Sequence, residues 1–196
     1  MTPWRGILAG VVVLGGAALA HAGAVEGAAT IAGRAASGAV VYLEPRTPGS
    51  VPPPRVRAVM DQRNLAFAPA VLPVMRGTRI DFTNSDDVQH NVFSPSAVAG
   101  KFNLGTYGPG ASRAVTLDKT GDVLILCNIH MEMEAHILVL DSPYFASVGA
   151  DGRYRIVDVP AGEYVLRIWQ DRWRSFSRTL EVQREEILTM DVAAGE

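Results

Sequence analysis

The chain has 196 residues, an apolar fraction of 48% and a formal net charge of −2. This length allows one large or two small domains, each able to bury a hydrophobic core. The balance of 18 basic against 20 acidic residues argues against a general nucleic-acid-binding protein, so we expect no nucleic-acid partner.

The first 22 residues have the pattern of a secretory signal peptide. Arg5 provides a short positive region, Ile7–Ala20 is apolar or glycine, and residues 20–22 read Ala-His-Ala, a small-x-small cleavage site. The apolar run is short and rich in glycine for a membrane span, although an uncleaved anchor is the alternative. We therefore expect cleavage after Ala22, a mature protein in a bacterial periplasm, and no membrane span after cleavage.

The rest of the chain is dominated by period-two alternation and turn residues, with no long stretch of helical periodicity. Segments 38–44, 78–83, 114–117 and 123–127 are among the predicted strands. Many short strands at nearly regular spacing predict an all-β protein built from sandwiches. The dipeptide at 151–152, Asp-Gly, predicts a tight hairpin turn between strands at 145–148 and 153–157.

The chain contains one cysteine, Cys127. In an oxidising compartment it has no partner for an internal disulfide. A bridge to another chain, an inert buried thiol and a metal ligand therefore remain as alternatives. Since an exposed free thiol can be oxidised or captured by another thiol, a metal bond would remove that liability.

Cys127, His130 and Met133 follow one another at intervals of three residues, after an apolar strand. A short loop can turn the histidine and methionine back toward the thiolate at the end of that strand. A thiolate, an imidazole and a thioether favour copper over calcium or magnesium. Zinc is the main competing metal, because it also accepts nitrogen and sulfur ligands.

A fourth ligand must come from elsewhere in the chain, and His90 is the only histidine outside the signal and the Cys127 segment. The gap between His90 and Cys127 leaves room for about three strands at ~3.3 Å per residue, so a Greek-key sandwich can bring the two segments together. His90, Cys127 and His130 in a plane, with Met133 as a weak axial ligand, would form a blue-copper electron-transfer site.

Several neighbouring side chains are alternative ligands. Met131 could replace Met133 as the thioether, and Glu132 or Glu134 would give an oxygen ligand and a different copper site. His136 could belong to an enzyme-type site, but we expect it on the solvent face of its strand. Without a second cluster of histidines and cysteines, we expect no enzyme.

The two ligand segments together resemble the cupredoxin family of type 1 blue copper proteins. The short ligand loop is similar to that of amicyanin and favours Met133 over Met131 as the axial ligand. The motifs that carry the resemblance are Asn84…His90-Asn91-Val92 and Cys127-x-x-His130-x-x-Met133.

This resemblance implies one copper ion that cycles between Cu(II) and Cu(I) and single-electron transfer between redox partner proteins. It implies that the electron leaves through the exposed edge of His130. It also implies that the side chain of Asn91 bridges the two ligand loops by hydrogen bonds. The alternative function is a copper-binding or copper-delivery module without an electron-transfer role.

The whole chain resembles cupredoxins of the methylamine-utilisation type, which join a plastocyanin-like domain to a carboxypeptidase-regulatory-like, transthyretin-like β-sandwich. We expect the signal peptide at 1–22, the cupredoxin domain at 58–141 and the second sandwich at 24–57 and 142–196. Residues 29–45 resemble the first hairpin of that second sandwich, so the cupredoxin is expected to be inserted in it. This split arrangement requires strand 38–44 to pair with the hairpin at 153–169.

Overall fold

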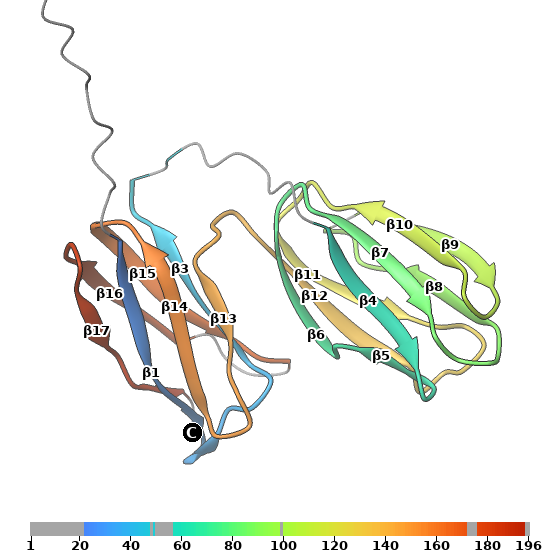
Figure 1. Cartoon of the computed structure of the whole chain (residues 1–196), viewed down its shortest axis with the longest axis horizontal. Helices are drawn as coiled ribbons and strands as arrows, with labels where there is room; N and C mark the ends of the chain where they lie inside the picture. The colour runs from blue at the N-terminus through green and yellow to red at the C-terminus, as the bar shows by residue number, and fades with distance from the viewer. Residues whose placement is uncertain (1–21, 48, 50–56, 99, 172–175, 195–196) are drawn as a thin grey trace, which may run out of the picture.

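The computed structural model describes residues 22–47, 49, 57–98, 100–171 and 176–194. In this part of the chain all regular elements are β-strands, and they form four sheets in two separate units (Figure 1). The predicted all-β sandwich class is therefore confirmed. None of the described segments is a helix long and apolar enough to cross a membrane. The predicted signal peptide lies outside the described residues except for its last residue, Ala22.

The central unit is a sandwich of two sheets, with strand orders β10-β7-β4-β5 and β6-β12-β11-β8-β9. Its strands are β4 (Ala58–Arg63), β5 (Ala66–Ala68), β6 (Val71–Met75), β7 (Arg79–Asn84), β8 (His90–Ser94), β9 (Phe102–Tyr107), β10 (Ser112–Thr116), β11 (Gly121–Leu126) and β12 (Glu134–Leu140).

The terminal unit combines the two ends of the described chain in a second sandwich. One sheet has the order β14-β1-β17, with β2 and β18 also paired to β1, and the other has the order β13-β3-β15-β16. Its strands are β1 (Gly23–Ile31), β2 (Arg34–Ala35), β3 (Val40–Pro45), β13 (Phe145–Ser147), β14 (Arg153–Val159), β15 (Gly162–Trp169), β16 (Phe176–Val182), β17 (Ile187–Thr189) and β18 (Val192–Ala194).

Each unit has its own hydrophobic core. In the central unit, alternate residues of the paired strands β11 and β12 point inward, as the period of two in a strand requires. Inside this core, Val123 of β11 faces Ile137 of β12, and Ile125 faces Ala135. The same alternation places Cys127, the first residue after β11, in the core as well. The strand pattern thus decides where the thiol points.

The terminal unit is formed by strands from both sides of the central unit. β3 precedes the central unit and pairs antiparallel with β15 over its full length, from Val40↔Trp169 to Pro45↔Tyr164. β3 also pairs with β13, which follows the central unit. This is the pairing that the split arrangement requires, and it supports the expectation that the central unit is inserted in the terminal sandwich.

The predicted hairpin around Asp151-Gly152 is wrong. The dipeptide does form a turn, in which Gly152 has a positive φ of 79° and the N–H of Gly149 donates to the carbonyl of Arg153. The strands on either side, however, enter different sheets, because β13 pairs with β3 and β14 pairs with β1. The turn connects the two layers of the sandwich.

A small apolar cluster joins the two units, since Val40 of the terminal unit packs with Leu138 and Leu140 of β12. These leucines lie on the face of β12 opposite the central core. His136 lies on the same face, so the terminal unit covers it and only 12% of its side chain is exposed. Our prediction that His136 lies on the solvent face was therefore wrong.

Candidate metal centre

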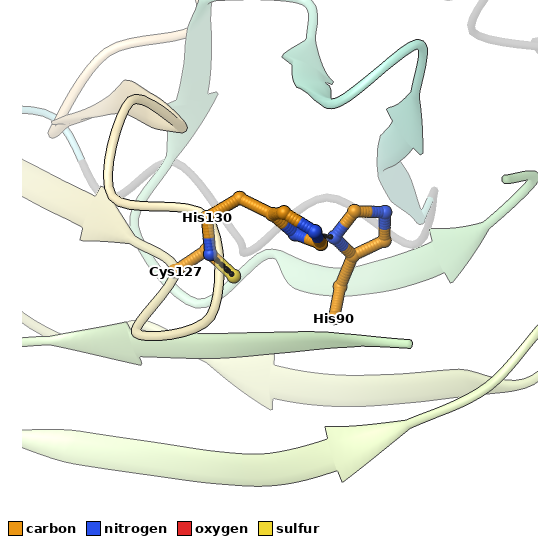
Figure 2. A group of neighbouring side chains, drawn as sticks. All are labelled: His90, Cys127 and His130. Carbon is orange, nitrogen blue, oxygen red and sulfur yellow. Dashed lines mark hydrogen bonds between the residues drawn. The ribbon is translucent and has the colours of Figure 1, made fainter. Parts of the chain in front are cut away.

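His90, Cys127 and His130 lie together at one end of the central unit (Figure 2). One nitrogen of each ring and the sulfur of Cys127 all lie within 4.8 Å of one another. The Nδ1 atoms of His90 and His130 face each other at 3.1 Å, and the ring centroids are 4.8 Å apart. Three predicted ligands thus converge, although β9, β10 and β11 separate His90 from Cys127 in the chain.

His90 opens strand β8 and is completely buried. The pairing of β8 with β9 has a register shift between Asn91 and Phe93, the mark of a bulge. A bulge bends the strand and re-aims side chains, which accounts for the burial of His90, Asn91 and Val92 in succession where regular alternation would expose one of them. The bulge therefore allows His90 to point into the site from the end of the strand.

The sulfur of Cys127 accepts backbone N–H groups from both ligand segments. Asn91 donates at 3.5 Å, Ile129 at 3.4 Å and His130 at 3.5 Å. Such donors stabilise a thiolate, which burial in an apolar core would otherwise disfavour. These three hydrogen bonds fix the position of the sulfur between the two ligand segments.

The loop after Cys127 is closed by its own backbone. The N–H of Met133 donates to the carbonyl of His130 at 3.0 Å, and the N–H of Cys127 donates to the carbonyl of Met133 at 3.3 Å. Met133 is 1% exposed and shares the core of Cys127, whereas Met131 is 87% exposed. Burial therefore favours Met133 over Met131 as the thioether of the site. Glu132 and Glu134 are exposed.

Asn91 is buried beside the site but makes a different contact from the one expected. Its side-chain amide donates to Oδ1 of Asn103 in β9 at 2.9 Å, and its own Oδ1 has no hydrogen-bond partner among the described residues. The link to the other ligand segment is its backbone N–H, which reaches the sulfur of Cys127. The expected bridge is thus made by the main chain in place of the side chain.

Asp86, which the sequence analysis did not single out, fixes the ring of His90. Its Oδ2 lies 2.8 Å from Nε2 of His90 and also accepts the N–H of Leu65, while its Oδ1 accepts that of Asn64. Burial raises the pKa of this carboxyl, but the N–H of Leu65, His90 and the N–H of Asn64 outweigh burial, so the net pKa is lowered. A carboxylate can only accept hydrogen bonds, so the Nε2 atom of His90 carries a proton. In the neutral ring the electron pair is then on Nδ1, which faces His130.

Tyr107 of β9 lies directly opposite His90 in the β8–β9 pair. Its hydroxyl accepts a hydrogen bond from Nε2 of Gln62 at 2.6 Å and donates to the carbonyl of Phe82 at 3.2 Å. Burial raises the pKa of Tyr107 to about 12, so it remains neutral at physiological pH. The surroundings of the site are therefore fixed by neutral hydrogen bonds as well as by packing.

The donor atoms suit copper. Two imidazole nitrogens and a thiolate converge, and a buried methionine lies in the same core. This is the ligand set of blue-copper sites, whereas calcium and magnesium require oxygen ligands.

Comparison with known proteins supports the same class. Residues 54–140 match the sequence model of the family described as copper binding proteins of the plastocyanin/azurin type. The central unit has the fold of a cupredoxin β-sandwich, and the family match supports copper as its metal. No curated protein matches the chain.

Solved structures similar to this chain include a copper-containing nitrite reductase, NirK, from Thermus scotoductus SA-01, at 22% identity and a TM-score of 0.43, covering 50% of this chain and 26% of the reductase. A mutant of amicyanin in its reduced state is 20% identical, with a TM-score of 0.41, over 43% of this chain and 82% of amicyanin. A purple cupredoxin from Nitrosopumilus maritimus is 20% identical, with a TM-score of 0.38, over 42% of this chain and 99% of that protein. This chain thus spans about a quarter of the length of the reductase.

Proposed function

We propose that this protein carries single electrons between redox partner proteins, with one copper ion held by His90, Cys127, His130 and Met133. The observation that carries the proposal is the convergence of two ring nitrogens on a thiolate that accepts three backbone N–H groups. When bound, copper would supply the Cu(II)/Cu(I) couple.

The protein's own contribution is to hold these ligands in place. His90 is fixed by Asp86, Cys127 by three N–H groups, and the loop by its internal hydrogen bonds. Since His90 and Cys127 are buried and already hydrogen-bonded, little rearrangement would accompany gain or loss of an electron. Buried partners that orient ligands in this way are typical of tuned metal sites.

The route for the electron runs through His130, which is partly exposed. Ile129 and Met131 beside it are exposed large apolar residues, as is Val88 in the loop that leads to His90. A group of exposed apolar side chains around a redox site can bind a partner by excluding water between the two proteins. We propose that redox partners dock here and exchange electrons through the edge of the His130 ring.

The proposal also covers the setting of the protein. We propose export through the signal peptide at 1–22 and a role in a bacterial periplasm, in the manner of methylamine-utilisation cupredoxins. The terminal unit would be the carboxypeptidase-regulatory-like sandwich, with boundaries at 24–57 and 142–196 around a cupredoxin domain at 58–141. In this proposal the chain is an electron carrier and not an enzyme.

The test is addition of Cu(II) to the purified protein with visible absorption as the readout. We expect an intense thiolate-to-copper band that saturates at one copper per chain, disappears on reduction and returns on reoxidation. A colourless complex that takes up only Cu(I) would contradict electron transfer and favour the alternative, a copper-binding or copper-delivery module.

Replacing Asp86 with asparagine is expected to raise the reduction potential of the copper site. The carboxylate near His90 favours the more positive Cu(II) state, and the amide removes that charge while it can still accept from His90. A tenfold change in the redox equilibrium would appear as a rise of about 60 mV in a redox titration. Asp87→Asn, at the exposed neighbouring position, is the control. An unchanged potential in Asp86→Asn, or an equal shift in both variants, would contradict this role.

A further inference from the structure

A second group of potential metal ligands lies at the junction of the two units. Glu134 and His136 belong to β12 of the central unit, and Asp171 follows β15 of the terminal unit. One ligand atom from each lies within 4.8 Å of the other two. Nε2 of His136 is 3.6 Å from Oε1 of Glu134 and 3.8 Å from Oδ1 of Asp171.

The fold builds this group from both units. β12 runs beside β6 on the side of the central unit that faces the terminal unit (Figure 1). Leu138 and Leu140 of β12 pack there on Val40. His136 on that face meets Trp169 at the end of β15, with ring centroids 5.3 Å apart. Asp171 lies two residues beyond Trp169 and thus reaches the imidazole from the other side of the junction.

The imidazole of His136 is oriented so that a metal could bind at Nε2. Its Nδ1 lies 2.9 Å from Oδ1 of Asp122, and a carboxylate only accepts hydrogen bonds, so the ring's proton is on Nδ1. The hydrogen bond with Asp122 and the charges of Asp171 and Glu134 raise the pKa of His136, so a metal would take the place of a proton on Nε2. A carboxylate on the far nitrogen of a ligating histidine is the usual partner in metal sites, because it fixes the ring and makes the ligand more basic.

Nε2 of His136 is buried and has no hydrogen-bond partner among the described residues. A buried polar atom in this condition is unfavourable unless something absent from the protein chain satisfies it. The carboxylates near it are too distant for hydrogen bonds. Their distances instead approach the separation of about 3.4 Å between ligand atoms around a tetrahedral ion with bonds of about 2.0–2.1 Å.

The chemistry of the group indicates which metal would bind. One imidazole and two carboxylates, without sulfur, suit zinc and differ from the soft ligands around Cys127. Glu134 and Asp171 are partly exposed, so an ion can reach the group from solvent.

We propose that Glu134, His136 and Asp171 bind a zinc ion that joins the two units. The site is separate from the candidate copper site and does not depend on electron transfer. Because its ligands come from both units, the ion would bind only the folded protein and would stabilise the junction of the units. Ligands that bind only the folded state raise the temperature of unfolding.

The test is a calorimetric titration of the purified protein with Zn²⁺, after the first site has been filled with one equivalent of Cu(I), which the soft ligands select. We expect one zinc per chain and a zinc-dependent rise in the unfolding temperature. His136→Gln and Asp171→Asn should each weaken zinc binding at least tenfold and remove the rise. Asp141→Asn, which changes an exposed carboxylate near the junction paired with Arg76, is the matched control and should change neither.

Absence of zinc binding, or affinity unaltered in both variants, would overturn the proposal. If His136→Gln fails to fold, Asp171→Asn decides, because this side chain is partly exposed and its replacement keeps its shape. The same titration of Cys127→Ser without copper separates this site from the first one, since that change removes a ligand from the first site and none from the second. Zinc binding that disappears in Cys127→Ser would therefore also overturn the proposal.

Discussion

Replacement of Cys127 with serine is expected to abolish the intense visible band of the copper-loaded protein. The band requires a thiolate, and Cys127 is the only cysteine in the chain. Serine has nearly the same shape, and its hydroxyl offers two lone pairs to the N–H groups around the sulfur, so the fold should persist. Absorption spectra of both proteins at equal copper content measure the effect.

The matched control is His136→Gln, which removes a histidine that contacts Asp122 away from the candidate copper site. This variant should keep the full intensity of the band, and circular dichroism should show that both variants are folded. If Cys127→Ser retained the band, or if His136→Gln lost it while folded, the ligand assignment would be wrong.

The two neighbouring methionines should behave in opposite ways. Met133 is buried in the core, so Met133→Ala should lower the free energy of unfolding of the metal-free protein by about 2–5 kcal/mol. Met131 is almost fully exposed, and Met131→Ala should change that energy by less than about 0.5 kcal/mol. Urea unfolding of the metal-free variants measures the difference.

Leucine substitutions separate ligation from packing. Met133→Leu conserves volume and should cost less than about 1.5 kcal/mol. It removes the thioether, however, which as a weak donor favours Cu(II), so the reduction potential should rise by about 60 mV or more. Met131→Leu should leave the potential unchanged. A shift of the reduction potential in Met131→Leu, with none in Met133→Leu, would show that Met131 and not Met133 provides the thioether.

Much of the candidate site could be predicted from residue spacing and strand periodicity. Cys127 directly follows an alternating apolar strand, and His130 stands three residues later in a short loop, so the convergence of these two residues follows from local geometry. The placement of His90 depended on a sandwich that returns to the same end after three strands, and the structure has β9, β10 and β11 in that interval. Resemblance to a family, more than periodicity, singled out Met133, which is buried while Met131 is exposed.

The features that could not be predicted depend on contacts between distant segments. Asp86 reaches His90 only because the N–H groups of Asn64 and Leu65, in the turn between β4 and β5, hold its carboxylate. The Asn91 side chain turns to Asn103 because of a bulge that no alternation pattern announces. His136 stands at a position that alternation assigns to the outside of its own sandwich, and a second sandwich covers it. A single sequence does not show which outward face another unit will cover.

The pairing of β3 with β13 has a consequence for folding. Tyr42 is paired with Phe145 across about 100 residues of intervening chain, and closing a flexible loop of that length costs about 4 kcal/mol of chain entropy. If the central unit folds first, its compact body brings the two strands close, and most of that entropy has already been lost. The terminal sheets would then be completed only after the central unit has folded. Copper bound at the candidate metal centre would therefore speed the assembly of the terminal sandwich, although all its proposed ligands lie in the central unit.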